Sequence, residues 1–385
     1  MKIINVVGTR PNFMKIAPIL RQMRKYAAAF QPTLIHTGQH YDYEMSKVFF
    51  KDLELPEPDI YLEIGSGTHA EQTGKVMIEF EKVLIREKPD LVVVVGDVNS
   101  TLAAALSAVK LHIPVAHVEA GLRSRDREMP EEINRVLTDA ISDYLFTPSL
   151  DAQENLRKEG IPEDRIFFVG NVMVDSLLYS EEKARKSDIL ARLGLITKGG
   201  SRAADYTLLT LHRPSNVDNK KSLKRILDAL SEIQKKIKIV FPIHPRTRRK
   251  LREFGYQSFL SNSGQWDPTI QSINRETNSV IITPPLAYLD FLKLEMKARL
   301  IMTDSGGIQE EATILGVPCL TLRETTERPV TVTQGTNVVV GNDENRIVKE
   351  TLKVLGGKRK RGERPRFWDG RAAQRIVEIL REQSK

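Results

Sequence analysis

The chain has 385 residues, of which 41% are hydrophobic and 28% are charged, a composition typical of a globular protein with more than one hydrophobic core. Its formal net charge of +8 suits an anionic ligand, but aromatic residues make up only 6% and do not alternate with basic ones, which argues against a protein that binds nucleic acid. The single cysteine, Cys319, excludes an intramolecular disulfide and a cysteine-rich metal site.

The same features bear on where the protein works. No apolar run approaches the roughly 20 residues that span a bilayer, so we expect no membrane partner. A strand-like run begins at residue 2, and we therefore expect no signal peptide. A lone cysteine within the apolar run 317–322 suits a reducing compartment. Together these observations predict a cytoplasmic protein.

The first half of the chain alternates strand-like and helix-like segments. Its strand-like runs are residues 2–7, 33–37, 91–95, 114–118, 144–147 and 166–169. Its helical patterns lie near residues 11–28, 70–87, 100–111, 131–142 and 150–159. This alternation is typical of a parallel, doubly wound sheet. The run 91–95 is apolar throughout, as expected for a strand covered on both faces.

The second half repeats this pattern. Its strand-like runs are residues 206–211, 238–242, 280–283, 298–303, 318–322 and 337–340. Its helical patterns lie near residues 223–236, 246–253, 289–295, 308–315, 346–354 and 371–381.

We therefore predict an α/β protein of two Rossmann-like domains with parallel sheets and a cleft between them. The predicted domains are residues 1–171 and 172–366, with a linker near 170–174. A last segment, 367–385, is expected to form a helix that packs back on the first domain. Ligands of such sheets bind beyond the carboxyl ends of the strands, so the residues that follow the strands are the candidates for function.

Two cations follow the first strand. Gly8 permits a tight turn, and Arg10 and Lys15 then lie near a helix N-terminus, where they suit an anion. The dinucleotide fingerprint G-x-G-x-x-G and the Walker phosphate loop are both absent from this turn. The alternative interpretation is that both cations are solvated on a surface helix.

Three carboxylates follow later segments of the first half. Asp97 comes after the strand 91–95, and Glu119 comes after the strand 114–118. A carboxylate at the end of a buried strand is costly unless it is paired, which favours a role in catalysis or binding. Glu131 lies in the first turn of a helix, where its charge also suits the helix dipole and needs no further explanation.

The second half carries a candidate phosphate site. The sequence Ser305-Gly306-Gly307 joins a buried strand to a helix, a geometry in which backbone N–H groups cradle a phosphate. Glu311 lies about one helical turn further, within reach of a sugar hydroxyl. The alternative is a plain strand-to-helix turn that needs glycine for steric reasons.

Two histidines, His212 and His244, follow neighbouring strand-like runs and are expected to line the same cleft. The seven histidines of the chain show no metal-binding spacing, so we predict no metal site. Carboxylates on one domain and a histidine with an anion cradle on the other favour proton transfer on a phosphorylated or nucleotide-linked substrate.

Seven motifs in this order resemble the non-hydrolysing UDP-N-acetylglucosamine 2-epimerases. They are G-T-R-P-x-x-x-K at residues 8–15, G-D-x-x-S-T at 96–101, H-V-E-A-G-L-R at 117–123, P-E-E-x-N-R at 130–135, H-R-P-x-N at 212–216, T-D-S-G-G-I-Q-E-E at 303–311 and T-T-E-R-P at 325–329. The resemblance implies a glycosyltransferase-B-like fold and an isomerase that interconverts UDP-GlcNAc and UDP-ManNAc, supplying ManNAc-type sugars for surface polysaccharide or glycan synthesis. It implies anti elimination of UDP to 2-acetamidoglucal followed by re-addition, without a cofactor.

The resemblance also assigns roles to residues. The implied acid/base set is Asp97, Glu119, Glu131 and His212, with no base singled out. The implied substrate-binding set is Arg10, Lys15, Arg213, His244, Phe291, Ser305, Gly306, Gly307, Glu311 and Arg328. Bacterial members bind a second UDP-GlcNAc as activator, for which the candidates here are Gln39, His40 and Gln72. A homodimer is expected from the family alone.

Three other functions stay open on the sequence. One is a 2-epimerase of a UDP-2,3-diacetamido-uronate sugar, the second is a glycosyltransferase on the same fold, and the third is an inactive sugar-nucleotide sensor.

Overall fold

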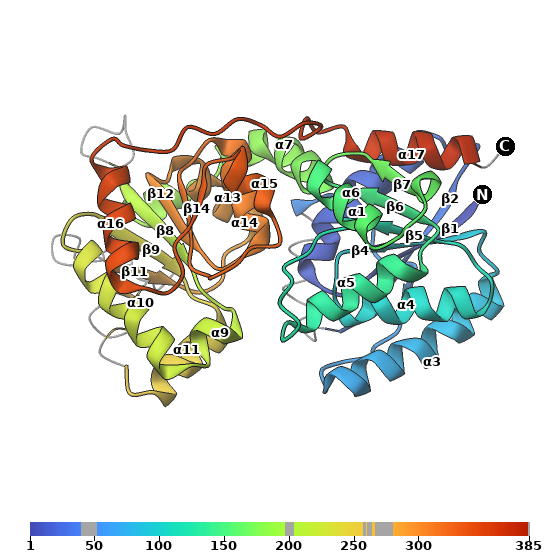
Figure 1. Ribbon diagram of the computed structural model, residues 1–385, viewed down its shortest axis with the longest axis horizontal. Helices are drawn as coiled ribbons and strands as arrows, with labels where there is room; N and C mark the ends of the chain where they lie inside the picture. Colours follow the sequence, from blue (N-terminus) through green and yellow to red (C-terminus); the bar gives the residue numbers. More distant parts are fainter. Residues whose placement is uncertain (40–51, 197–203, 257–258, 260–263, 266–279, 384–385) are drawn as a thin grey trace. The chain divides into compact units, whose positions relative to one another are not determined.

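The structure is a computed structural model that describes the chain except for residues 40–51, 197–203, 257–258, 260–263, 266–279 and 384–385 (Figure 1). The chain forms two compact units. Unit 1 comprises Met1–Ser180 and Arg366–Lys385, and unit 2 comprises Glu181–Pro365. Among the described residues, no helix combines the length and the apolar character needed to cross a membrane.

The division between the units falls inside α7 (Val172–Arg185), a helix that begins where the sequence predicts a linker and a domain boundary at 171/172. Gly170 ends the preceding segment with a φ of +89°. Asn171 then accepts a hydrogen bond from the N–H of Met173 at 2.9 Å, as a helix-capping side chain does. The Asn171 cap thus starts a helix in the segment 170–174, which the sequence predicts to be a linker.

Unit 1, as far as it is described, holds one seven-stranded parallel sheet in the order β3-β2-β1-β4-β5-β6-β7. Its strands are β1 (Lys2–Val7), β2 (Gln31–His36), β3 (Ile60–Tyr61), β4 (Leu91–Val95), β5 (Val115–Val118), β6 (Tyr144–Thr147) and β7 (Ile166–Phe168). Its other helices are α1 (Arg10–Arg24), α3 (His69–Glu87), α4 (Asn99–Lys110), α5 (Pro130–Ile141), α6 (Leu150–Lys158) and α17 (Ala372–Gln383), with a short 3-10 turn at Glu163–Arg165.

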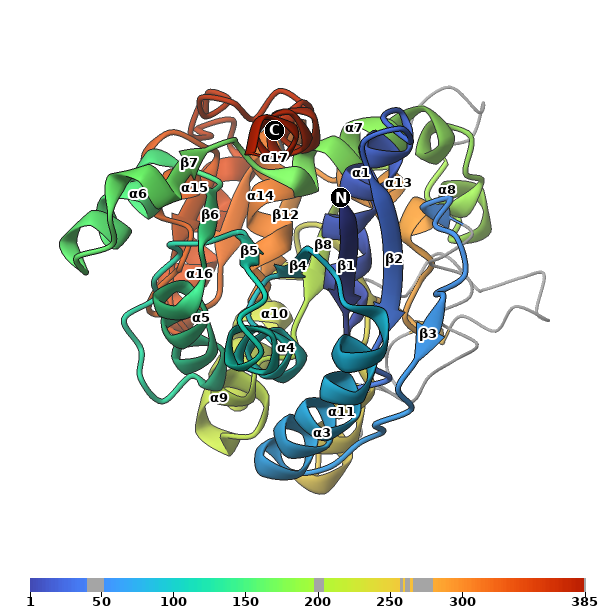
Figure 2. The ribbon, with the colours of Figure 1, turned by 90° about the vertical axis from the view of Figure 1, so that its right-hand side faces the viewer.

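Helices cover both faces of this sheet. Figure 2 shows α3, α4 and α5 on one face and α1 with α17 on the other. All five residues of β4 are buried, as expected for a strand covered on both sides. The carboxyl ends of β1, β4 and β5 therefore form the edge at which polar residues of this unit can gather.

The chain returns to unit 1 at its C-terminal end, where α17 packs on α1. Trp368 anchors the approach to this helix, because its ring N–H donates to the carbonyl of Pro148 at 2.9 Å and its side chain is buried. Asp175 of α7 then accepts hydrogen bonds from the N–H groups of Ala372 and Ala373, at 3.2 and 2.9 Å. One buried carboxylate thus satisfies two of the unpaired donors in the first turn of α17.

Replacing Asp175 by alanine is expected to destabilise unit 1 by about 1–2 kcal/mol, because these two donors lose their acceptor. Burial raises the pKa of Asp175 from 3.8 to about 6, although the two backbone hydrogen bonds lower it. The pKa of this carboxyl group is higher in the folded state than in the unfolded state. Its contribution to the free energy of unfolding is therefore fully present below the unfolded pKa and is lost as the pH rises through about 6. Urea unfolding should therefore show a larger effect of Asp175→Ala at about pH 5 than at about pH 8. Asp164→Ala, in an exposed turn, is the control, and an equal loss at both pH values would contradict the assignment.

The described part of unit 2 has a second seven-stranded parallel sheet, in the order β10-β11-β9-β8-β12-β13-β14. Its strands are β8 (Tyr206–Thr210), β9 (Lys238–Pro242), β10 (Gly264–Gln265), β11 (Val280–Thr283), β12 (Leu300–Thr303), β13 (Cys319–Thr321) and β14 (Asn337–Val339). Its helices are α8 (Ile189–Arg192), α9 (Pro214–Val217), α10 (Lys220–Ile233), α11 (Pro245–Glu253), α13 (Tyr288–Lys297), α14 (Gly306–Leu315), α15 (Pro329–Thr333) and α16 (Glu344–Leu355).

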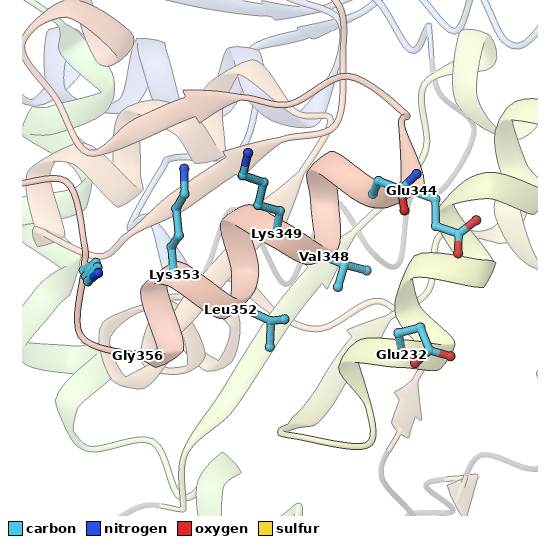
Figure 3. A pocket seen from close by; sticks show the side chains of 9 residues that line it. Glu232, Glu344, Val348, Lys349, Leu352, Lys353 and Gly356 are labelled. Atoms are coloured by element: carbon cyan, nitrogen blue, oxygen red, sulfur yellow. The ribbon is translucent and has the colours of Figure 1, made fainter.

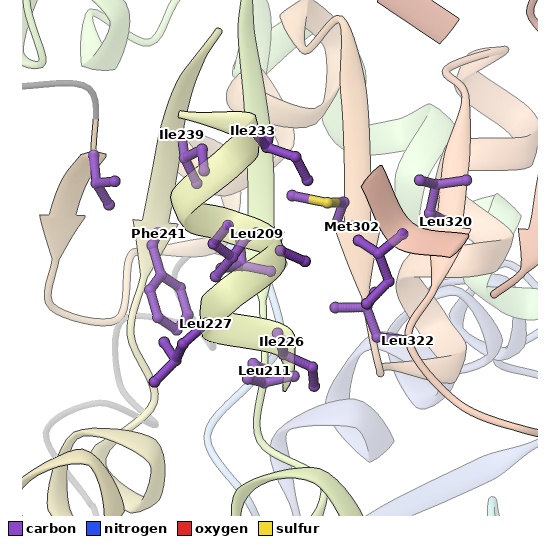
Figure 4. Packing of buried hydrophobic residues seen from close by; sticks show 14 of the residues in the cluster. Leu209, Leu211, Ile226, Leu227, Ile233, Ile239, Phe241, Met302, Leu320 and Leu322 are labelled. Carbon is purple, nitrogen blue, oxygen red and sulfur yellow. The ribbon is translucent and has the colours of Figure 1, made fainter. Parts of the chain in front are cut away.

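Successive residues of β8 enter two separate cores. Leu209 packs in the core beneath α10 and α16, which Figure 4 shows with Phe241 and Met302 from neighbouring strands. Leu208 packs in the opposite core, beneath α8, α13 and α14. This alternation is the two-residue period of a strand buried on both faces. The second core fixes α13 and α14, the two helices that carry half of the predicted binding residues of unit 2.

Candidate functional site

Two of the predicted acid/base residues, Asp97 and Glu119, follow the neighbouring strands β4 and β5. The strand register pairs Val95 with Val118, so both carboxylates leave the sheet at the same edge. Glu119 has a φ of +76°, in the left-handed region that residues with a side chain rarely adopt. Such a conformation costs about 1–3 kcal/mol and is found preferentially at active sites. This backbone conformation agrees with the prediction that Glu119 is functional, which stays a prediction.

Lys15 lies against Glu119 rather than in solvent. Its Nζ donates to Glu119 Oε2, and the two side chains are only 7% and 4% exposed. Gly96 makes room for this pair, because a Cβ atom there would lie 2.8 Å from Lys15 Nζ. The interpretation of Lys15 as a solvated surface cation is therefore wrong. Lys15, which the resemblance assigns to the diphosphate, is here the counterion that fixes one oxygen of Glu119.

Asp97 is held by a buried arginine. Arg135 of α5 donates to Asp97 Oδ2 and, at 2.8 Å, to Glu132 Oε2. The Asp97 side chain is 23% exposed, whereas that of Arg135 is 2% exposed. Asp97 thus has a fixed direction and a surface open to solvent. Glu131, the predicted member of the acid/base set on this helix, is half-buried in the first turn of α5.

A second buried network supports the segment that carries Glu119. His117 Nδ1 lies 2.6 Å from Asp139 Oδ1, and Arg123 Nη1 lies 2.7 Å from Asp139 Oδ2. The N–H of Gly121 also donates to Asp139, at 3.0 Å. Burial alone would raise the pKa of Asp139, but the charges and hydrogen bonds of His117 and Arg123 outweigh burial and lower it. Asp139 therefore positions the turn that holds Glu119 in its unusual conformation.

The candidate activator residues lie near the N-terminus of α4. Gln39 Oε1 accepts hydrogen bonds from Ser100, at 3.1 Å from its N–H and 2.6 Å from its hydroxyl. Gln72 Oε1 accepts from Asn99 Nδ2 at 2.9 Å. The structure thus brings Gln39 and Gln72 to the same helix end. The third candidate, His40, and the side chain of the predicted binding residue Arg10 lie outside the described part of the chain.

The Ser-Gly-Gly segment of unit 2 connects β12 to the ten-residue helix α14. Ser305 is the N-cap in extended conformation, and Gly306 is the first helical residue. Gly307 follows in the first turn, half-buried. The N–H groups of this turn have no partner within the helix, so the segment has the backbone arrangement that the sequence predicts for an anion site.

The imidazole of His212 is oriented by the buried Asp304. His212 Nδ1 lies 3.0 Å from Asp304 Oδ1. The carboxylate also accepts the backbone N–H groups of His212 and Arg213, at 3.0 and 2.9 Å from Oδ2. Burial alone would raise the pKa of Asp304, but the charge of His212 and these hydrogen bonds lower it. His212 is therefore held with its other ring nitrogen directed away from Asp304, and its side chain is 34% exposed.

His244 lies beside His212. The ring centroids are 5.7 Å apart, and the rings are tilted by 40°. His244 is the exposed N-cap of α11, where its Nδ1 accepts the N–H of Arg246 at 3.2 Å. The structure thus brings the two histidines together at the ends of β8 and β9, and their place in a ligand cleft stays a prediction. Arg213, another predicted binding residue, is half-buried next to them.

Arg328 is committed to ion pairs behind the Ser-Gly-Gly segment. Its Nε lies 2.7 Å from Glu310 Oε1, and its Nη1 lies 2.6 Å from Glu327 Oε1. Its side chain is 8% exposed. Gly306 allows this packing, since a Cβ atom there would lie 2.3 Å from Arg328 Nη1. Arg328, which the resemblance assigns to the substrate, therefore supports the first turn of α14 from within the unit.

Gly306→Ala is expected to destabilise unit 2 by about 1–3 kcal/mol, because the new methyl group displaces the Arg328 guanidinium from its two carboxylates. Gly74→Ala is the matched control, since Gly74 also lies in a helix but has nothing within 4 Å of the added methyl group. The control should be neutral or more stable, as alanine favours the helix. Urea unfolding midpoints measure both, and an unchanged midpoint for Gly306→Ala would show that the turn can relax.

The remaining predicted binding residues lie on α13 and α14. Glu311 is 5% exposed and accepts a hydrogen bond from the hydroxyl of Tyr288 at 2.9 Å. Burial raises the pKa of Glu311 to about 7, although the hydrogen bond from Tyr288 lowers it. Phe291 is partly buried and packs on the core beneath these helices, together with Leu286.

A surface hollow of unit 2 lies away from these residues. It has a volume of about 600 Å³ and lies between α10 and α16, lined by Glu232, Val348, Lys349 and Leu352 among others (Figure 3). None of the predicted site residues lines it.

Sequence reasoning missed the residues that hold the candidates in place. Arg135 lies three residues after Glu132 in P-E-E-x-N-R, a spacing at which two helical side chains meet. Asp304 is an acid directly after a buried strand, the same signal that marks Asp97 and Glu119. Asp139 carries no such signal, because its partners His117 and Arg123 belong to other segments.

Comparison with known proteins identifies relatives along nearly the whole chain. The family model described as UDP-N-acetylglucosamine 2-epimerase matches residues 22–381. A protein of Methanocaldococcus jannaschii named UDP-N-acetylglucosamine 2-epimerase is 48% identical over 383 residues, which cover 99% of both chains. A Pseudomonas aeruginosa protein named UDP-2,3-diacetamido-2,3-dideoxy-D-glucuronate 2-epimerase is 40% identical, again over 99% of both chains.

Solved structures agree with these matches. The Methanocaldococcus jannaschii enzyme in complex with UDP-GlcNAc and UDP superposes with a TM-score of 0.87 at 48% identity, covering 99% of both chains. The Neisseria meningitidis enzyme bound to UDP-GlcNAc has a TM-score of 0.86 at 33% identity, covering 99% of this chain and all of the other. The predicted glycosyltransferase-B-like α/β fold, with two parallel sheets of Rossmann type, is confirmed.

Proposed function

The chain belongs to the UDP-N-acetylglucosamine 2-epimerase family, and from this membership we propose that it interconverts UDP-GlcNAc and UDP-ManNAc by inverting C2 of the sugar. The family is one of isomerases. The observation that best supports the proposal is the pair of carboxylates at one sheet edge, Asp97 and Glu119. Each is hydrogen-bonded by a buried cation, and Glu119 stands on a strained backbone.

The proposed reaction separates C2 inversion into two steps. In the first, a carboxylate of the set Asp97, Glu119 and Glu131 removes the C2 proton while the C1–O bond to UDP breaks, which leaves 2-acetamidoglucal. In the second, UDP adds back at C1, and C2 receives a proton on the opposite face. Arg135 and Lys15 each donate to one carboxylate of this pair and fix its orientation toward the proton to be transferred. His212, oriented by Asp304, completes the acid/base set.

Unit 2 is proposed to hold the departing UDP. Negative charge grows on the diphosphate as the glycosyl bond breaks, and donors that are already in place stabilise it best. The first turn of α14 supplies N–H groups from Gly306 and Gly307, with the hydroxyl of Ser305 beside them. Arg213 and His244 are proposed to line the substrate, and Glu311 and Phe291 to contact the ribose and the base.

Proton exchange at C2 tests this function directly. The purified protein is incubated with UDP-GlcNAc in D₂O and followed by proton NMR. The expected result is deuterium at C2 of the sugar together with the appearance of UDP-ManNAc. Product formation without deuterium at C2 would exclude the proposed proton transfer. A protein that exchanges nothing and transfers the sugar only when an acceptor is added would instead be a glycosyltransferase.

A second substrate is favoured by one observation, the 40% identity to the Pseudomonas aeruginosa protein named for a UDP-2,3-diacetamido-uronate sugar. The same NMR assay with both sugar nucleotides in equal amounts separates the two. Faster C2 exchange on the uronate sugar nucleotide would show that this compound, rather than UDP-GlcNAc, is the preferred substrate.

Assembly and regulation are proposed as well. Ile133, Val136 and Leu137 form an exposed apolar stripe on α5, at 36%, 37% and 47% exposure, which supports a homodimer through this face. Light scattering that gave a monomer would contradict it.

A second UDP-GlcNAc is proposed to bind as activator near Gln39, His40 and Gln72, and hyperbolic kinetics without activation would exclude that. We also propose that the enzyme works in the cytoplasm, where sugar nucleotides are made.

A further inference from the structure

Glu295 is a buried carboxyl group that the proposed mechanism does not use. It lies on α13 with an exposure of 0%. Among the described residues, neither of its oxygens meets a hydrogen-bond donor. A charged carboxylate in this position would be very costly, and even a neutral one needs a partner. The position therefore calls for an explanation beyond packing.

The group that Glu295 faces is the carboxyl group of Glu311, on the neighbouring helix α14. The other titratable groups near Glu295 are Tyr288 on its own helix, Tyr206 of β8 and Cys319 of β13, all buried. Each of these groups is neutral or negative at ordinary pH. Two acceptor groups that face one another, with no positive charge among them, attract only when a proton lies between them.

The proton belongs mainly to Glu295. Burial, reinforced by the charge of Glu311, raises the pKa of Glu295 well above its usual value. Burial raises the pKa of Glu311 only to about 7, because the hydrogen bonds from Tyr288 and Glu295 lower it, although the charge of Glu310 raises it. Above about pH 7, Glu295 is thus a neutral acid, and Glu311 is the anion of the pair.

We propose that Glu295 is a positioning residue of the nucleotide site, which donates its proton to Glu311 and, together with Tyr288, orients that carboxylate to accept the ribose hydroxyls of the bound nucleotide. The proposal rests on the proposed function, which places UDP against Glu311. Glu295 itself makes no contact with the ligand. It acts by supplying a hydrogen bond that stabilises the anionic form of Glu311.

The proposal gives the affinity for UDP a defined pH dependence. Glu311 accepts both ribose hydroxyls only as the anion, so the affinity should fall as the pH drops through about 7. A residue at 295 that still donates a hydrogen bond should keep this profile. A residue that cannot donate should leave the Glu311 anion less stable, and the midpoint of the profile should move to higher pH.

Calorimetric titration with UDP across this pH range tests the inference in the wild type, Glu295→Gln and Glu295→Leu. The glutamine amide replaces the acid as donor, and its affinity at alkaline pH should stay within about 3-fold of the wild type. Leucine removes the donor without leaving a polar group, so the affinity near neutral pH should fall about 10-fold or more, with the midpoint moved upward. Tyr288→Phe removes the other donor to Glu311 and should shift the profile in the same direction.

Thermal unfolding of each variant separates this role from a purely structural one. Glu295→Leu replaces a buried polar group by an apolar one of similar volume, so its melting temperature should be no lower than that of the wild type. A second readout is the preference for UDP over 2′-deoxy-UDP, which should be smaller in Glu295→Leu.

Three outcomes would overturn the inference. The first is a wild-type pH profile in Glu295→Leu, and the second is an equal loss of affinity in the glutamine and leucine variants at every pH. The third is a pH profile that Tyr288→Phe leaves unchanged. This third outcome can be measured even if the leucine variant does not fold. Failure of the proposed function looks different, because the wild type would then not bind UDP at any pH.

Discussion

Asp97→Asn is expected to slow C2 proton exchange by about 100- to 10,000-fold, the usual contribution of a general acid or base. Asparagine has nearly the same shape as aspartate, and its amide oxygen can still accept the hydrogen bond from Arg135. It cannot take up a proton. Affinity for UDP should stay at the wild-type level, because the first turn of α14, which is proposed to hold the diphosphate, lies in unit 2 and Asp97 lies in unit 1.

The measurement combines deuterium incorporation with UDP titration on the same preparation. Asp164→Asn, in the exposed turn Glu163–Arg165, is the matched control and should exchange at the wild-type rate. Wild-type exchange in Asp97→Asn would remove Asp97 from the acid/base set and leave Glu119 and Glu131 as the candidates.

Asp304→Ala should have the largest effect on stability, a loss of about 3–5 kcal/mol in the free energy of unfolding of unit 2. Asp304 is 0% exposed. It accepts the N–H groups of His212 and Arg213 and, at 3.3 Å, the side-chain amide of Asn216. Alanine removes the acceptor of these donors, and the His212 ring loses the carboxylate that orients it.

Urea unfolding measures the loss, and Asp228→Ala provides the comparison. Asp228 pairs with Lys224 at 2.6 Å on an exposed face of α10, where such a pair contributes less than about 1 kcal/mol. Near-equal losses in the two variants would show that Asp304 is not the anchor of the His212 segment. Slower C2 exchange in Asp304→Asn, with stability kept, would separate the orienting role from the structural one.

The sequence predicts the sheets well because their strands are buried on both faces. The limits of β1, β4, β6, β9 and β11 match the predicted runs. Leu91–Val95, for example, is a continuous apolar segment with clear ends, because Asp90 precedes it and Gly96 follows it. The strands β3 and β10 were not predicted, since two residues each carry no readable period. The start of α7 was missed because its cap lies in a segment that resembles a linker.

The sequence predicts the residues of the candidate site but not the contacts that hold them. Position after a strand identifies Asp97, Glu119 and His212, because that rule depends on local order alone. It cannot show that Lys15 pairs with Glu119, 104 residues away, or that Arg328 turns inward to Glu310. Such contacts follow from tertiary packing. They show that both cations support their own unit, and the predicted contacts of both with the substrate stay predictions.

The return of residues 366–385 to unit 1 has a consequence for biosynthesis. Unit 2 is one continuous segment, 181–365, so it can fold as soon as it leaves the ribosome. Unit 1 cannot be completed until α17 has been translated, because Ile376, Val377 and Leu380 are buried on the side where α17 packs on α1. The nascent chain therefore carries an uncovered apolar surface on α1 throughout the synthesis of unit 2. α17, which is made after unit 2, is the element that covers this surface, so a chain that stops before α17 would expose it to chaperones and proteases.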